Sequence, residues 1–213
     1  MTEDEAKAWL KASFDVPRET WERLDGYVQL LLSEMDQQNL IAESTRDHVW
    51  ARHIVDSAQL LKLDVPPSNG AWIDLGSGAG LPAIVIAILS CRPVVMIESR
   101  KKRIEFLNRV VADLKLSNAG VIGGRVETAP VAEAAVISAR AYAPLDRLLS
   151  SARHLSTDKS VWILPKGRNA QNELEAARSA WQGVFHVERS ITDPESAIII
   201  ARSVAPRGRK GRK

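Results

Sequence analysis

The stretch from Ala71 to Pro82 constrains the fold of this chain more than any other part of it. It reads Ala-Trp-Ile-Asp-Leu-Gly-Ser-Gly-Ala-Gly-Leu-Pro. Its apolar beginning predicts the end of a short buried strand, and glycines at every second position allow a sharp turn that approaches a ligand closely. Pro82 stands where a helix should begin, because the missing N–H of proline costs nothing there. Strand, glycine turn and helix are the first crossover of a nucleotide-binding α/β fold.

The spacing of the glycines separates two kinds of nucleotide site. A dinucleotide site has Gly-x-Gly-x-x-Gly, whereas here Gly80 follows Gly78 by two residues and Leu81 comes next. Asp74 stands two residues before Gly76, where a carboxylate repels a pyrophosphate but suits a ligand that carries an ammonium and a sulfonium. The stretch therefore resembles the first motif of S-adenosylmethionine-binding domains. A glycine-rich turn without a ligand is the alternative.

Length and composition limit the class of protein. The chain has 213 residues, of which 45% are hydrophobic, so it can form one large domain or a domain with an appendage. Acidic residues in the first turn predict that there is no signal peptide, and no apolar run is long enough to span a membrane. The single cysteine, Cys91, excludes an internal disulfide framework and is interpreted as an inert core thiol. We expect a soluble, cytoplasmic protein without a metal site.

The net charge of +3 comes from the end of the chain. Without residues 207–213, 24 basic and 26 acidic residues remain, which leaves a net charge of −2. A tail of glycine, arginine and lysine is typical of a disordered arm that contacts phosphate backbones, and a plain solvated terminus is the alternative. The basic residues of this tail are Arg207, Arg209, Lys210, Arg212 and Lys213.

Hydrophobic periodicity divides the chain into a helical cap over residues 1–65, an α/β core over 66–204 and the basic tail over 205–213. In the cap, apolar residues three and four positions apart predict helices over 3–13, 18–38 and 47–61. In the core, helices are predicted over 81–90, 100–115 and 170–181, and strands over 72–73, 93–98, 121–122, 134–138, 161–164, 184–188 and 197–201. The last two strands have no helix between them and should pair antiparallel.

Two further groups are predicted to lie at the carboxyl ends of the strands, where ligands of open α/β sheets bind. Glu98 ends the second strand, and an acid at this position accepts hydrogen bonds from ribose hydroxyls; a surface glutamate that caps the strand is the alternative. After the third strand, the backbone of Val126 and Glu127 can bracket an adenine, and Arg125 can face a phosphate. A plain turn is the alternative for this second group.

Arg140 follows the fourth predicted strand, at the position where S-adenosylmethionine-dependent methyltransferases place reactive groups. The chain has neither the Asn/Asp-Pro-Pro-aromatic turn of amino-group methyltransferases nor a cysteine at this edge. Arginine cannot act as a base, but its planar fork can hold a carboxylate, a phosphate or the acceptor face of guanine. A structural ion pair is the alternative.

Several motifs in order along the chain, many of them outside the cofactor turn, resemble one family over about residues 20–205. It is the glucose-inhibited division protein B family of bacterial 16S rRNA guanine-N7 methyltransferases. The motifs are Asn39-Leu, Arg52-His-Ile-Val-Asp-Ser57, Asp74 to Pro82, Arg125-Val-Glu, Ser138-Ala-Arg-Ala and Pro165-Lys166-Gly. The sequence departs from the family pattern at Ile41, Ala135 and Pro165, and the last of these bears on the pose of Lys166.

The resemblance implies a Rossmann-like class I methyltransferase fold, α/β, with a mostly parallel seven-stranded sheet, flanking helices and an N-terminal helical cap. It implies S-adenosylmethionine as the cofactor and 16S rRNA, in the small ribosomal subunit or its precursor, as the partner of a monomer. The residues expected at the cofactor are Asp74, Gly76, Gly78, Leu81, Glu98, Val126, Glu127 and Arg140. Those expected to face RNA or the reacting base are Asn39, His53, Arg125 and Lys166, with Arg207, Arg209 and Lys210 from the tail.

The chemistry of guanine N7 fits this residue set. N7 has a lone pair and loses no proton when it attacks, so the reaction requires alignment rather than a general base. Arg140, Lys166 and His53 are therefore expected to position the reactants, although His53 also suits a purely structural role. Two other functions stay open at this stage, namely methylation of a small metabolite and RNA binding by a non-catalytic assembly factor.

Overall fold

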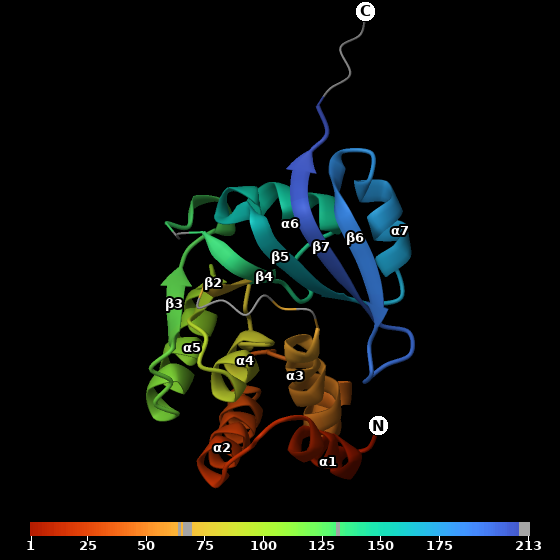
Figure 1. The fold of residues 1–213 in the computed structure, drawn as a ribbon. Coiled ribbons are helices and arrows are strands. Elements are labelled where there is room, and N and C mark those ends of the chain that lie inside the picture. The colour runs from red at the N-terminus through yellow and green to blue at the C-terminus, as the bar shows by residue number, and fades with distance from the viewer. Residues whose placement is uncertain (64, 66–69, 131–132, 209–213) are drawn as a thin grey trace, which may run out of the picture.

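The computed structural model describes residues 1–63, 65, 70–130 and 133–208, and its centre is a seven-stranded sheet (Figure 1). The strand order is β3-β2-β1-β4-β5-β7-β6, and the first five strands in the sequence run parallel. β7 pairs antiparallel with both β5 and β6, which confirms the predicted hairpin. The strands are β1 (Trp72–Leu75), β2 (Val94–Glu98), β3 (Ala119–Gly123), β4 (Ala134–Ser138), β5 (Ser156–Lys166), β6 (Trp181–Arg189) and β7 (Ala197–Pro206).

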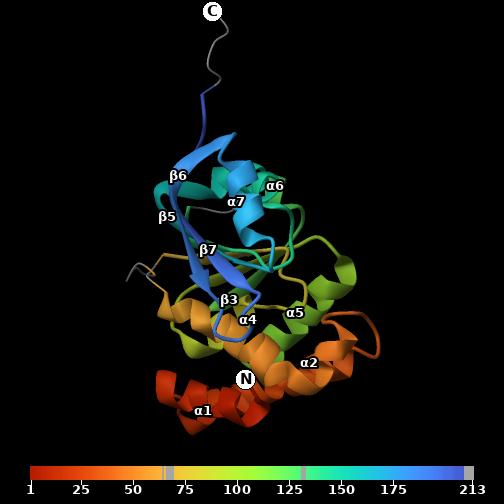
Figure 2. The same ribbon diagram turned by 90° about the vertical axis from the view of Figure 1, so that its right-hand side faces the viewer.

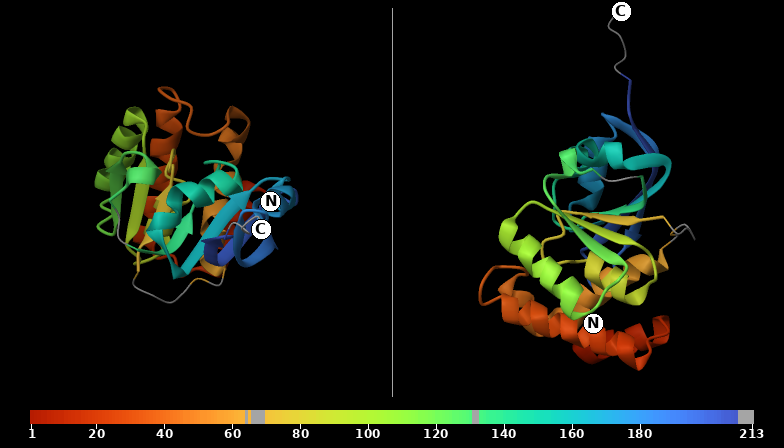
Figure 3. Two further views of the ribbon diagram at one scale, coloured as in Figure 1. Left: turned by 90° about the horizontal axis from the view of Figure 1, so that it is seen from above. Right: turned by 90° about the vertical axis from the view of Figure 1, so that its left-hand side faces the viewer.

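Helices cover both faces of this sheet (Figures 1 and 3). On one face, α4 (Ala83–Leu89) and α5 (Lys101–Asp113) share a hydrophobic core with the N-terminal helices. On the other face lie α6 (Leu145–Ala152) and α7 (Ala170–Ala177). Helix α6 was not predicted, because its apolar stripe spans only two turns. The expected architecture, an open and mostly parallel seven-stranded sheet between two helical layers, is confirmed.

The first helices, α1 (Glu3–Ser13) and α2 (Arg18–Glu34), lie together at one end of the molecule, as Figure 2 shows. The hydroxyl of Tyr27, on α2, donates a hydrogen bond of 2.9 Å to the carbonyl of Ala79. The N-terminal helices therefore support the glycine turn directly and share its core. The division into a cap and a core stays a prediction.

The third predicted helix is not one regular α-helix, which corrects the sequence interpretation. The chain forms a 3-10 turn η1 (Glu43–His48), a π-helix η2 (Trp50–Val55), one turn of α-helix α3 (Asp56–Ala58) and a 3-10 turn η3 (Gln59–Lys62). The carboxylate of Glu3 accepts the N–H groups of Trp50 and Ala51, so a tertiary contact holds the start of the π-helix. Single turns of π-helix are frequent at functional sites, and periodicity cannot distinguish them from α-helix.

At the other end, β7 continues to Pro206, and Arg207 still belongs to the folded structure. Its N–H donates to the carbonyl of Ala180 at 2.7 Å and its Nε to that of Trp181 at 3.1 Å. Arg209 and Lys210 lie outside the described residues, so the proposed tail rests on the sequence. Among the described residues, no helix is long and apolar enough to cross a membrane.

Candidate active site

The glycine turn joins β1 to α4, and its three glycines are required for different reasons. All three have positive φ values, of 63° at Gly76, 57° at Gly78 and 90° at Gly80. A Cβ at Gly80 would lie 2.6 Å from Ile84, and one at Gly76 would lie 2.6 Å from the ring of Tyr142. At Gly78 the nearest atom would be 3.5 Å away. Packing therefore fixes the outer two glycines, while only the backbone conformation requires a glycine at Gly78.

Glu98 holds this turn against the end of β2. One carboxylate oxygen accepts the N–H of Gly78 at 2.9 Å, and the other accepts those of Ser99 and Arg100 at 2.7 and 2.8 Å. The guanidinium of Arg103 lies 4.0 Å from the first oxygen. The carboxylate thus links the end of β2 to the turn that follows β1. In this fold a nucleotide binds at these two strand ends. Contact between Glu98 and a ribose stays a prediction.

Asp74 is completely buried, and its two oxygens have different surroundings. Oδ1 accepts a 2.6 Å hydrogen bond from Ser138, whose hydroxyl in turn accepts from the indole N–H of Trp72. Oδ2 has no hydrogen-bond partner among the described residues. Burial raises the pKa of Asp74 to about 7. Because an unpartnered buried oxygen is costly, this atom fits an ammonium such as that of S-adenosylmethionine.

We expect cofactor binding to release a proton from Asp74. With a pKa of about 7, the carboxyl of the free protein is largely protonated at pH 6, whereas an ammonium favours the carboxylate. Affinity for S-adenosylmethionine should therefore rise with pH up to about 7 and then level off. Calorimetry at pH 6 in two buffers of different ionisation enthalpy measures the proton count.

The Asp74→Asn variant should lose this proton release, and Asp113→Asn, at an exposed position on α5, should keep it. Binding at pH 6 without proton release would contradict the assignment of an ammonium to Asp74.

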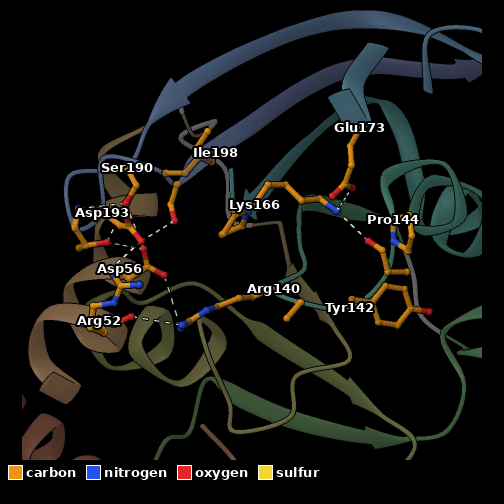
Figure 4. Close-up of a pocket in the computed structure, with 17 residues that line it drawn as sticks. Arg52, Asp56, Arg140, Tyr142, Pro144, Lys166, Glu173, Ser190, Asp193 and Ile198 are labelled. Carbon is orange, nitrogen blue, oxygen red and sulfur yellow. Dashed lines mark hydrogen bonds and ion pairs between the residues drawn. The ribbon is translucent and has the colours of Figure 1, made fainter. Parts of the chain in front are cut away.

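Arg140, two residues after the end of β4, is held on one side by the helical segment η2–α3 (Figure 4). Its Nη2 donates to Nδ1 of His53 at 2.8 Å and to the carbonyl of Arg52 at 3.4 Å. Its Nη1 lies 3.7 Å from Oδ2 of Asp56 and has no hydrogen-bond partner within the described ranges. The guanidinium is thus oriented, and its buried Nη1 is paired with Asp56 but makes no hydrogen bond to any described residue.

His53 is only 4% exposed and acts on Arg140. Burial, followed by the charges of Arg140 and Arg52, lowers the pKa of His53 to about 3, so the ring is neutral at physiological pH. Because Nδ1 accepts from Arg140, the proton lies on Nε2, which donates to the hydroxyl of Thr45 at 2.7 Å. Both nitrogens are engaged, so the ring suits positioning rather than proton transfer. Contact of His53 with RNA stays a prediction.

Beside Arg140 lies a pocket of about 410 Å³, which is large enough for a nucleobase. The β6–β7 hairpin forms one wall, and its contacts with the helical segment include Arg52 to Asp193 at 2.9 Å and Thr192 to Asp56 at 2.9 Å. The charged and aromatic side chains that line it are Arg52, Asp56, Arg140, Tyr142, Lys166, Glu173 and Asp193 (Figure 4).

Lys166, at the end of β5, lines the pocket despite the proline before it. Pro165 lies within the strand, in register with Ile198 of β7. The ammonium of Lys166 donates to the carbonyl of Ala143 at 2.9 Å and to Glu173 at 2.8 Å. These two partners determine its pose, which the sequence left open.

The structure brings Arg140 and Lys166 to the pocket, with His53 buried against Arg140, but leaves other predicted residues outside the pocket. Asn39 is exposed after α2, and its neighbour Gln38 donates to the carbonyl of Lys102 at the start of α5. At the 3-10 turn η4 (Val126–Thr128), Val126 is buried whereas Arg125 and Glu127 are exposed. Leu81 is buried in the core. The cofactor and RNA contacts of all these residues stay predictions.

Cys91 is exposed, so its interpretation as a core thiol was wrong. It lies between α4 and β2, in a connection at the edge of the sheet opposite to the glycine turn. Within the described ranges, no group of three or more His, Cys, Asp or Glu side chains could hold a metal ion.

Five of the charged and aromatic residues that line the pocket have no role predicted from the sequence, namely Arg52, Asp56, Tyr142, Glu173 and Asp193. Arg52 and Asp56 belong to the motif Arg52-His-Ile-Val-Asp-Ser57, and their spacing of four residues is the sequence signal that places them on one face of a helix. The others come from segments distant in sequence, which only the fold brings together.

The fold and this site define a class I S-adenosylmethionine-dependent methyltransferase. A glycopeptide N-methyltransferase crystallised with S-adenosylmethionine has the same fold, with a TM-score of 0.60 and 11% identity over 70% of this chain and 93% of its own.

The sequence profile of the rRNA small subunit methyltransferase G family, GidB, matches residues 20–199. A protein named ribosomal RNA small subunit methyltransferase G from Sphingopyxis alaskensis is 49% identical over 96% of this chain and 88% of its own. A Zymomonas mobilis protein of the same name is 47% identical over 99% and 98%. The chain therefore belongs to this methyltransferase family.

Proposed function

We propose that this protein transfers a methyl group from S-adenosylmethionine to N7 of a guanosine in 16S rRNA. The observation that carries the proposal is Arg140, oriented by a neutral histidine at the edge of a nucleobase-sized pocket. The names of the relatives support small-subunit rRNA as the substrate.

The cofactor would lie over the carboxyl ends of β1 and β2, where Asp74 and the glycine turn meet. When bound, S-adenosylmethionine supplies a methyl group activated by a sulfonium. Asp74 would hold its ammonium, Glu98 its ribose, and the backbone of Val126 and Glu127 its adenine. Gly76, Gly78 and Leu81 would shape the surface beneath it.

The target base would enter the pocket beside Arg140. Guanine presents N7 and O6 as acceptors on one edge. Nη1 of Arg140, which makes no hydrogen bond within the described part of the chain, would donate to O6 in place of its contact with Asp56 while N7 faces the cofactor. Lys166 adds positive charge at the other side of the pocket. N7 loses no proton, and the neutral His53, with a pKa of about 3, does not titrate near neutrality. With saturating cofactor, kcat should therefore be nearly constant from pH 6.5 to 8.

The remaining predicted RNA residues lie outside the pocket and would contact the phosphate backbone. Asn39 and Arg125 are exposed, and Arg207 would act with Arg209 and Lys210 of the tail. Such contacts give affinity that depends on salt but not on sequence. We propose a cytoplasmic monomer that acts on the small ribosomal subunit or its precursor.

Product analysis tests the proposed function. Wild-type protein is incubated with labelled S-adenosylmethionine and small subunits from a strain that lacks the activity, and the RNA is treated with cleavage chemistry specific for 7-methylguanosine. We expect label in 16S rRNA and cleavage at one guanosine. Methylation of another atom would overturn the proposal, as would RNA binding without cofactor consumption or turnover of small metabolites alone.

A further inference from the structure

Glu173, on α7, uses its two carboxylate oxygens differently. Oε2 accepts the N–H of Leu145, the first residue of α6, at 2.9 Å, and the ammonium of Lys166 at 2.8 Å. No hydrogen bond from the described residues reaches Oε1, and the side chain is 30% exposed where it lines the pocket. Figure 4 shows the carboxylate held against Lys166 at the side of the pocket opposite to Asp56. A fixed carboxylate therefore offers one free acceptor to the pocket.

The two sides of the pocket carry different groups. On one side Arg140 carries N–H donors, of which Nη1 is buried and lies 3.7 Å from Asp56. On the other side Glu173, paired with Lys166, offers an acceptor. Guanine has the matching pair of edges, because N7 and O6 accept hydrogen bonds while N1–H and the 2-amino group donate them. Adenine would place the lone pair of its N1 against the carboxylate, which is repulsive.

We propose that Oε1 of Glu173 accepts hydrogen bonds from N1–H and the 2-amino group of the target base and thereby selects guanine. This inference rests on the proposed function. An enzyme that acts on a base removed from its stack reads the Watson–Crick edge of that base. A polar group of the site that is left without its partner then penalises other bases.

The same contact strengthens during the reaction. N7 forms its new bond to the methyl carbon with its lone pair as the bond between carbon and sulfur breaks, and no proton leaves, so the base becomes cationic. A carboxylate at the donor edge attracts this base more strongly in the transition state than in the ground state. Glu173 should therefore affect kcat as well as KM.

The Glu173→Gln variant tests this role with little change in shape. Leu145 N–H and Lys166 both require an oxygen, so the amide should turn its NH₂ toward the pocket and present a donor to the donors of guanine. The substrates are small subunits reconstituted with RNA that carries either guanosine or inosine, which lacks the 2-amino group, at the methylated position. The readout is the ratio of kcat/KM for guanosine to that for inosine.

For the wild type we expect a ratio of roughly 5 to 150, the range for a specific base contact. Glu173→Gln should lose a similar factor with guanosine, mostly in kcat, and its ratio should fall toward one. Glu175→Gln, at an exposed position on the same helix, should keep the wild-type ratio. Thermal melting and cofactor binding check that both variants are folded.

Two results would overturn the proposal. One is a folded Glu173→Gln variant that keeps the wild-type ratio. The other is a wild-type enzyme that methylates guanosine and inosine equally, which decides the question even if the variant does not fold. Failure of the wild type to form 7-methylguanosine would instead refute the proposed function itself.

Discussion

Replacing Arg140 with lysine should lower kcat/KM for rRNA methylation by about 100- to 1,000-fold, the usual cost of losing a transition-state donor. The guanidinium donates to His53 and to the carbonyl of Arg52 through Nη2, while Nη1 lies 3.7 Å from Asp56 and makes no hydrogen bond to the residues that the structure describes. A lysine has a single ammonium and cannot make both interactions in one geometry. Steady-state kinetics on small subunits measures the loss.

The fold should survive this change, because Arg140 lies at the carboxyl edge of the sheet and its side chain points to the pocket. Circular dichroism and thermal melting check this expectation. Arg147→Lys, at an exposed position on α6, is the matched control and should retain full activity. An Arg140→Lys enzyme as active as the wild type would remove Arg140 from the mechanism.

Replacing Gly78 with valine should weaken S-adenosylmethionine binding by more than about 100-fold, because strain and the bulk of the new side chain act together. The φ of +57° is unfavourable for a β-branched residue and costs about 1–3 kcal/mol. The side chain would also start 3.5 Å from Arg103 and occupy the surface on which a cofactor would lie. Relaxation of the strain would disturb the hydrogen bond from Gly78 to Glu98. Calorimetric titration of the purified variant measures the affinity.

Gly120→Val is the control for this experiment. Gly120 lies in β3, and a Cβ there would meet no atom within 4 Å, so valine should be accepted and cofactor affinity kept. Unchanged affinity in a folded Gly78→Val variant would show that the cofactor does not approach the turn.

The sequence determined the elements whose signals are local. These signals are a glycine turn after a strand, an acid at each of two strand ends and the hydrophobic periodicity of the chain. They predicted an α/β fold, the order in which the strands follow one another along the chain, and the edge of the sheet that carries the site. These features depend on the backbone preferences of neighbouring residues, which a sequence displays directly. Asp74, Glu98 and Arg140 were identified in this way, whereas Lys166 was expected from the resemblance to the family.

Only the tertiary structure decided which side chains meet and in which protonation state. His53 and Arg140 are 87 positions apart, and their contact depends on a π-helix that hydrophobic periodicity does not distinguish from an α-helix. Glu173 became part of the pocket because α7 packs beside α6 and the end of β5, where it meets Leu145 and Lys166. The pKa values of Asp74 and His53 arise from burial, and burial is a property of the packed chain as a whole.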